Sequence, residues 1–332
     1  MRMRRARAWC TARGRWQFAL TLAMVVVLTG ACGALLMLPN VALPRIRTAQ
    51  PSVAQSLGQA PAEDPRLAAV RRTLEPFGPI VADRVATGDG RESLLVGHSG
   101  QRVEMDILRS ELAPATAAIT ELWGPGWAQS ALVVVASNPS EFAALVRAGS
   151  IMPSEVAAVS VADPFARGTQ PTGQRVVFSP DAGRRLSPDE LRTLLRHELT
   201  HVATRADTVD GAPQWMLEGF AEYAAHRAQN HRFADIAPTV YARTRVGDLP
   251  TELPADPDFT GARAATTYET AWSVCAFVAD RYDEAHLVEL YRRIAAGKQD
   301  SVSEDRILRE VLGTDRSGFV AGWREWLSAR TA

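Results

Sequence analysis

The sequence predicts an α+β fold, and three observations support this class. Strand-like and helix-like segments mix between residue 65 and about residue 180, a strongly capped helix begins near residue 188, and the later segments are predicted to be helical. We therefore expect a part that contains a sheet, then one central helix, and then a mainly helical C-terminal lobe.

The first 64 residues are expected to lie outside this fold. Residues 1–15 carry six arginines and no acidic residue, and residues 16–38 carry no charge. An apolar span of about 20 residues crosses a bilayer, and arginines before it favour a cytoplasmic N-terminus. The sequence therefore predicts a cytoplasmic basic tail (1–15), a transmembrane signal anchor (16–38), a juxtamembrane linker (39–64) and an extracytoplasmic domain (65–332), which together make a single-pass protein of the cell membrane.

Two alternatives for this N-terminal segment stay open. A cleaved secretory signal has the same basic start, although its apolar core is usually only about 7–15 residues long. A lipoprotein signal at Cys32 fits less well, because Leu28 is one position too far from the cysteine.

The charge balance argues against nucleic acid as a partner. All six arginines of the tail belong to the 37 basic residues of the chain, so the predicted outer part holds fewer basic than acidic residues, of which there are 37. A mildly acidic domain is poorly suited to bind nucleic acid or an anionic lipid surface.

The segments before the central helix read as a mixture of strands and helices. We predict strands at 93–96, 132–135, 156–161 and 175–178, and helices at 106–123 and 140–147.

The central helix has a clear start and one apolar face. Ser187 and Glu190 form a capping-box pattern, with Pro188 at the first helical position. The apolar residues that follow recur at three- and four-residue spacing, which predicts a buried stripe: Leu191, Leu194, Leu195, Leu199 and Val202.

This helix carries a pattern typical of a zinc site. His197 and His201 are four positions apart, so both imidazoles lie on one face, and Glu198 follows the first of them. Zn²⁺ held by two histidines and a third protein ligand keeps one position for water, which Glu198 can deprotonate as general base and acid. A pattern that fixes only three positions also arises by chance, in roughly one chain per hundred. The capped helix strengthens the prediction, because it places the pattern in the secondary structure that a zinc site of this kind requires.

A second segment resembles the gluzincin metallopeptidases. In these proteins HExxH is followed by a helix with a glutamate ligand in a W-x-x-E-G-x-A context, which Trp215, Glu218, Gly219 and Ala221 match. The pattern HExxH...WxxEGxAE is most similar to the bacterial peptidase MA-like families and less similar to the aminopeptidase branch. A metzincin would need glycine and histidine where Thr204 and Asp207 stand.

The resemblance implies a zincin-like fold, one zinc ion and a peptide or protein substrate. Glu218 is the third zinc ligand that it implies, beside His197 and His201. In gluzincins a mixed sheet precedes the HExxH helix, and its edge strand binds the substrate backbone as an added strand. Residues 158–161 are the candidate edge strand, and an ordinary paired strand is the alternative.

Glu222 is predicted to support the metal ligands. It lies four residues beyond Glu218 and therefore on the same helical face, where a carboxylate can accept the free N–H of a ligating imidazole. The alternative is a solvated surface glutamate. His226, one turn further on, is interpreted as an ordinary polar residue.

Tyr268 is the candidate for stabilising the oxyanion, because a tyrosine hydroxyl near the metal can do so. It opens a run that resembles the tyrosine-led helix of aminopeptidase-type gluzincins, although Ala271 stands where that branch usually has glycine. The alternative is a residue that packs a core helix. Tyr223 and Tyr241 are weaker candidates for the same role.

The chain beyond Tyr223 is predicted to be mostly helical, with a long proline-rich loop at 237–265. The predicted helices are 267–282, 284–296, 303–312 and 317–328.

The sequence thus predicts a membrane-anchored, extracytoplasmic zinc metallopeptidase that hydrolyses peptide bonds through a metal-activated water. Two other functions stay open: a zinc hydrolase of a non-peptide substrate, and an inactive extracellular binding or scaffold module that retains the fold. Retention of Glu198 argues against an inactive module. The chain has no G-x-M-E-N motif, which disfavours an aminopeptidase.

Overall fold

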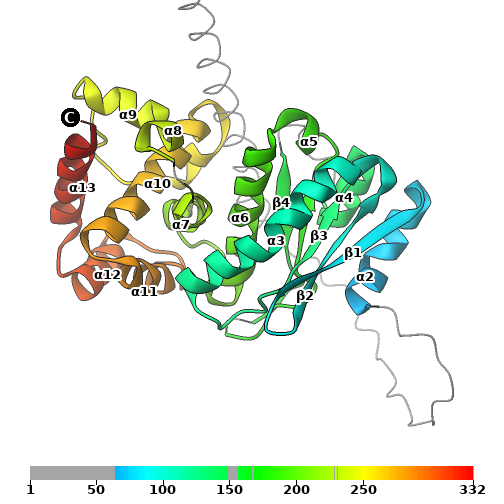
Figure 1. Cartoon of the computed structure of the whole chain (residues 1–332). Helices are drawn as coiled ribbons and strands as arrows, with labels where there is room; N and C mark the ends of the chain where they lie inside the picture. Colours follow the sequence, from blue (N-terminus) through cyan, green and yellow to red (C-terminus); the bar gives the residue numbers. More distant parts are fainter. Residues whose placement is uncertain (1–63, 149–155, 167, 228, 230, 332) are drawn as a thin grey trace, which may run out of the picture.

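The computed structural model describes residues 64–148, 156–166, 168–227, 229 and 231–331. A five-stranded mixed sheet forms one half of the molecule, and a mainly helical C-terminal part forms the other (Figure 1). The predicted α+β class is confirmed at this level.

The strand order is β1-β2-β3-β5-β4. β1 (Ile80–Gly88) and β2 (Arg91–His98) form an antiparallel hairpin. β3 (Leu132–Val135) and β5 (Arg175–Phe178) continue the sheet in parallel, and β4 (Ala158–Val161) pairs antiparallel with β5 at one end of the order. The buried strands β2, β3 and β5 are rich in Val and Leu because both of their faces are covered.

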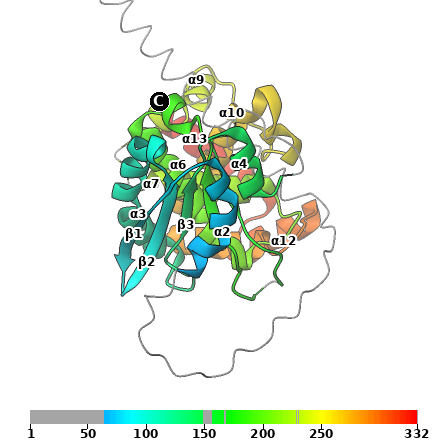
Figure 2. The ribbon, with the colours of Figure 1, turned by 90° about the vertical axis from the view of Figure 1, so that its right-hand side faces the viewer.

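Helices cover both faces of the sheet (Figure 2). α2 (Pro65–Leu74) and α4 (Pro139–Val146) enclose a smaller core with one strand face, which includes Leu94, Val134 and Val177. α3 (Arg102–Trp123) and the central helix α6 (Pro188–Thr204) pack on the other face, where the larger core continues into the helical half.

α6 begins as the capping box predicts. The Glu190 backbone N–H donates to Ser187 Oγ at 3.3 Å, and the Ser187 backbone N–H donates to Glu190 Oε2 at 2.7 Å. All five apolar residues of the predicted stripe are buried. The helix is therefore fixed at its start by its cap and along its length by the core.

The helical half comprises a series of helices after the short α5 (Ala182–Arg185) and α6. They are α7 (Gln214–Arg227), α8 (Phe233–Ile236), α9 (Pro238–Arg245), α10 (Ala264–Arg281), α11 (Glu284–Ile294), α12 (Ser301–Leu312) and α13 (Arg316–Thr331).

Gly219 sets how closely α7 and α10 approach. A Cβ at this position would lie 2.5 Å from the Ala271 carbonyl oxygen and 2.8 Å from its carbon, both of them backbone atoms of α10. Only glycine permits this contact. The glycine that follows the predicted ligand Glu218 therefore has a packing reason, and it brings the start of α10 next to the ligand helix.

Most predicted elements occur with end shifts of a few residues. β1, α2 and the short helices α5 and α8 were not predicted. The long loop predicted at 237–265 is wrong in part, because α9 and the 3-10 turns Asp256–Phe259 and Gly261–Arg263 lie within it.

The membrane localisation predicted from the sequence is corrected. Among the described residues, none of the helices combines the length and apolar character that crossing a bilayer requires. The predicted anchor at 16–38, the tail and the linker lie outside the described residues. We therefore assign the protein to no membrane or compartment.

Candidate metal centre

Three side chains from two helices meet at one point of the interior. His197 and His201 come from α6, and Glu218 comes from the neighbouring α7. The two histidine Nε2 atoms are 3.1 Å apart, and Glu218 Oε2 lies 3.3 Å from Nε2 of His197 and 3.6 Å from Nε2 of His201. These three atoms form a nearly equilateral triangle.

This triangle has the dimensions of one face of a zinc tetrahedron. Zinc–nitrogen and zinc–oxygen bonds of about 2.0–2.2 Å at tetrahedral angles place neighbouring ligand atoms about 3.3–3.5 Å apart. The observed separations of 3.1, 3.3 and 3.6 Å surround this value. Two imidazoles and one carboxylate are also a donor set that zinc accepts in catalytic sites, so the three residues fit the ion.

One side of the triangle faces the surface more than the others. The side chain of His201 is 16% exposed, whereas those of His197 and Glu218 are only 2% and 3% exposed. A water or a substrate group can therefore approach from the His201 side, while the other two ligands are held in the core.

Glu198 lies between the sheet and the metal-binding set. Its side chain is fully buried, and the Ser160 hydroxyl of β4 donates a hydrogen bond to it. Burial raises the pKa of Glu198, although the imidazoles of His197 and His201 act in the opposite direction. A carboxylate held in this position can accept a proton and return it.

Glu222 lies behind the first ligand, on the side away from the triangle. Its Oε1 is 3.1 Å from His197 Nδ1, and its Oε2 is 3.6 Å from His226 Nε2. The His226 Nδ1 in turn lies 3.4 Å from Nδ1 of His231. The structure thus brings Glu222 to His197, and it adds two histidines to which the sequence analysis gave no role.

The electrostatics of this cluster favour positive charge. Burial alone would lower the pKa of His197, yet its contacts with Glu218 and Glu222 raise that pKa well above the usual value. Burial would raise the pKa of Glu218, but the two imidazoles lower it to about 2. Glu218 and Glu222 are buried carboxylates that lie against imidazoles, and a divalent metal is a cation that such a cluster can hold.

Tyr268 lies on α10, one turn before Ala271, whose carbonyl contacts Gly219. It is 1% exposed and packs edge-on against Phe259, with ring centroids 5.1 Å apart. This places it in the helix that adjoins the ligand helix. Its rival Tyr223 is engaged elsewhere, because its hydroxyl donates to Glu284 at 2.8 Å.

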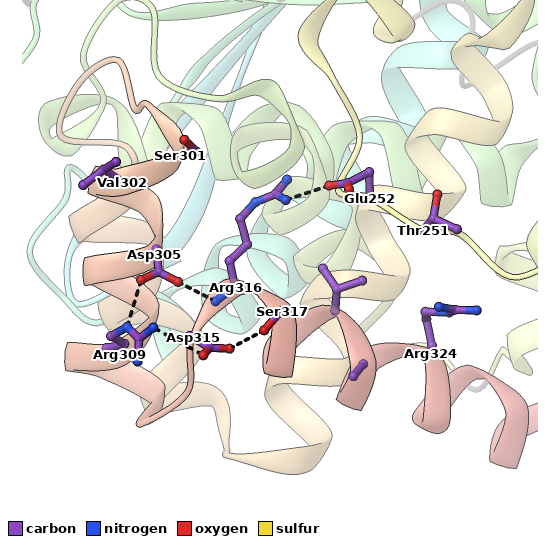
Figure 3. A pocket seen from close by; sticks show the side chains of 12 residues that line it. Thr251, Glu252, Ser301, Val302, Asp305, Arg309, Asp315, Arg316, Ser317 and Arg324 are labelled. Carbon is purple, nitrogen blue, oxygen red and sulfur yellow. Dashed lines mark hydrogen bonds and ion pairs between the residues drawn. The ribbon is translucent and has the colours of Figure 1, made fainter.

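A pocket of about 670 Å³ lies elsewhere, between α12, α13 and the segment near Glu252 (Figure 3). None of the metal-binding residues lines it. Its central charges neutralise one another, since Arg316 pairs with Glu252 at 2.6 Å and Arg309 pairs with Asp305 at 2.8 Å. We therefore place no site there.

Comparisons with known proteins give limited similarity. No family model matches the chain, and no curated protein matches it. Its structural neighbours are M1 zinc metallopeptidases. One of them, from Deinococcus radiodurans, is 16% identical with a TM-score of 0.46, over 77% of this chain and 53% of that chain. A mutant M1 zinc metallopeptidase from the same organism, bound to a Tyr-Ser-Ala substrate, is 15% identical with a TM-score of 0.41, over 77% of this chain and 53% of that one. This chain thus spans about half the length of these structures, and at such identities and TM-scores they do not establish its activity, metal or substrate.

Proposed function

We propose that this protein is a zinc-dependent metallopeptidase of the gluzincin type, similar to the bacterial peptidase MA-like families, with a zincin-like arrangement of its sheet and its HExxH helix. The observation that carries the proposal is the triangle of His197 Nε2, His201 Nε2 and Glu218 Oε2, with separations of 3.1–3.6 Å beside the buried Glu198. These residues would hold one zinc ion. Bound zinc would supply a water molecule of lowered pKa, about 7, and would polarise a carbonyl.

Glu198 is the general base and acid in this proposal. It takes the proton of the attacking water and returns it to the amine that leaves. Its buried position supports this role, because burial raises its pKa. Glu222 accepts the Nδ1–H of His197, so that Nε2 of the same ring keeps its lone pair for the metal.

The substrate is proposed to be a peptide in extended form. β4 ends the strand order, so one of its edges has no strand partner in the described sheet, and Ser160 of this strand contacts Glu198. A peptide that adds to this edge as a further strand would bring its backbone to the general base. Tyr268 is proposed to stabilise the oxyanion from α10.

The first experiment compares the wild-type chain with Glu198→Gln on a diverse peptide library, with and without a chelator. We expect chelator-sensitive cleavage by the wild type and a loss of at least about 1,000-fold in E198Q, since general base catalysis and proton return both disappear. Elemental analysis should find zinc in E198Q and none in His201→Ala. Cleavage by E198Q at the wild-type rate would refute the role of the base. Bound zinc without any cleavage by the wild type would refute the peptidase.

A further inference from the structure

Arg205 stands on the same stripe of α6 as Glu198 and His201. The three positions are spaced i, i+3 and i+7, so they follow one another along one face of the helix. Arg205 closes the helix and still has helical backbone angles, φ −54° and ψ −39°. Long side chains on helices lean toward the N-terminus, so we expect its guanidinium to lie on the side of the turn that carries His201.

Among the described residues, the guanidinium of Arg205 forms no ion pair at contact distance. Its Nε is buried without a hydrogen bond. Asp210 acts on it through space, and burial lowers the pKa of Arg205. By contrast, the partly buried Arg196 of the same helix pairs with Glu111 at 2.5 Å. Because Asp210 acts only through space and the buried Nε has no hydrogen bond, a ligand carboxylate in direct contact is the partner that this guanidinium would accept.

The outer strand of the sheet runs beside this stripe. Ser160 of β4 contacts Glu198. Further along the chain, the ring of Phe165 lies under Arg205, 5.4 Å from its Cζ atom. The Gly168 N–H then donates to the Ala206 carbonyl at 3.2 Å, which ties the loop to the end of α6. A chain laid along β4 therefore passes Glu198 first and reaches Arg205 afterwards.

The length of this path determines which substrate group can reach the arginine. Arg205 stands seven positions beyond Glu198, which corresponds to about 10 Å along the helix at about 1.5 Å per residue. An extended peptide covers this distance with about three residues at about 3.3 Å each. A carboxylate two to three residues from the scissile bond can thus lie at the guanidinium.

We infer that Arg205 binds a carboxylate of the substrate, two to three residues from the scissile bond, and thereby favours substrates with an acidic side chain or a free C-terminus at that place. The planar guanidinium pairs with a carboxylate through two parallel hydrogen bonds. This assignment rests on the proposed function, because Glu198 defines where the bond is cut.

The test uses one cleaved peptide core in matched versions. Asp or Asn is placed two and three residues from the scissile bond on either side, and each C-terminus is made as the free acid and as the amide. Against the full wild-type chain with its metal, we expect the acid-bearing versions to have roughly 10- to 100-fold higher kcat/KM. The peptides with Asp or Asn test for an acidic side chain, and the peptides with a free or amidated end test for a C-terminal carboxylate.

Three variants assign the preference to this side chain. Arg205→Gln should remove the preference and leave the neutral peptides within about twofold, whereas Arg205→Lys should keep part of it because the charge remains. Arg324→Gln, an exposed arginine of α13, should change nothing. Equal rates for acid and neutral peptides, or an equal loss on both in R205Q, would overturn the inference while the peptidase function stands.

A binding measurement separates this inference from the catalytic proposal. The E198Q chain should bind acid-bearing peptides more tightly than neutral ones, and the double variant E198Q/R205Q should lose that difference. A difference in binding without cleavage by the wild type would support the carboxylate site and refute the peptidase. No difference in binding would refute the carboxylate site itself.

Discussion

His197 has a different partner at each ring nitrogen. Nε2 faces Glu218 at 3.3 Å, while Nδ1 faces Glu222 at 3.1 Å. In the proposed function one carboxylate would share the metal with Nε2, and the other would fix the tautomer that leaves Nε2 free to bind it. The two glutamates, four residues apart on α7, hold the same ring from two sides.

Glu222→Gln should weaken metal binding without abolishing it. The amide keeps the size of the side chain but no longer supplies a charged acceptor to the ring, and changes of this kind typically cost 10- to 100-fold in metal affinity. A competition titration with a chromogenic chelator measures this change.

Tyr223→Phe is the matched control, because Tyr223 is the next residue on the same helix and its hydroxyl contacts Glu284 instead of the histidine. We expect its metal affinity to equal that of the wild type. If E222Q binds the metal with unchanged affinity, Glu222 does not support the metal centre.

The sequence predicts the residues of the candidate centre by two routes, helical spacing on α6 and the resemblance that points to Glu218 on α7. Helical periodicity alone places His197, Glu198 and His201 on α6. The same periodicity also points to Arg205, but only the lack of an ion pair at contact distance among the described residues gives it meaning. His231 could not be found in this way, because it reaches His226 from the segment after α7 and no regular spacing links the two.

At the scale of elements, the contact between α7 and α10 determines where Glu218, the proposed third ligand, lies. The backbone at Gly219 meets the backbone at Ala271, and Glu218 is the adjacent residue. A change in the distance between these helices would move the ligand itself.

Gly219→Ala should therefore damage the metal site as well as the fold. The added Cβ would lie 2.5 Å from a carbonyl oxygen, and neither backbone can yield locally, so we expect a loss of about 1–3 kcal/mol in the free energy of unfolding together with weaker zinc binding. Urea denaturation and metal titration measure the two effects.

Gly322→Ala in α13 is the control for a helical glycine. Its Cβ would lie 3.3 Å from the ring end of Phe277, a side chain that can shift. Its stability should stay within about 1 kcal/mol of the wild type, since alanine also favours the helix. A harmless G219A would show that the close approach of α7 and α10 does not constrain the site.

The elements that the sequence did not predict have physical reasons. β1 alternates half-buried and exposed residues and carries Asp83 and Arg84 in its middle. Its sequence is therefore only weakly apolar, and the strand is defined by its pairing with β2.

α9 lies in a proline-rich stretch, yet Pro238 occupies the first helical position. Its start is completed by Glu269 of α10, which accepts from the Thr239 and Val240 backbone N–H groups at 2.7 and 2.9 Å. Such a distant cap cannot be seen in the local sequence.

At the scale of the whole molecule, the proposed metal would link two helices that already pack against each other. α6 packs on the sheet and carries His197 and His201, while α7 starts the helical half and carries Glu218 (Figure 1). Metal binding should therefore depend on the relative position of the sheet half and the helical half.

Removal of the metal should lower the melting temperature of the whole chain. A metal present at about 1,000 times its Kd stabilises the folded state by about 4 kcal/mol, which corresponds to roughly 10 °C in Tm for a protein of this size. Calorimetry with and without a chelator measures the shift.

His201→Ala should melt at one temperature under both conditions, because it has lost a ligand. If the chelator removes zinc from the wild type and the melting temperature stays the same, the metal does not stabilise the contact between the two halves.

The short length of β4 limits which chains can pair with its open edge, including other copies of the protein. An open strand edge invites pairing between copies of a protein and thus aggregation. β4 has only four residues, which is too short a template for a stable sheet between two molecules but long enough to align a few residues of a flexible chain. Folded proteins rarely expose such a chain, so the same four residues would restrict the protein to unfolded segments, loose ends and short peptides, and would leave intact neighbours alone.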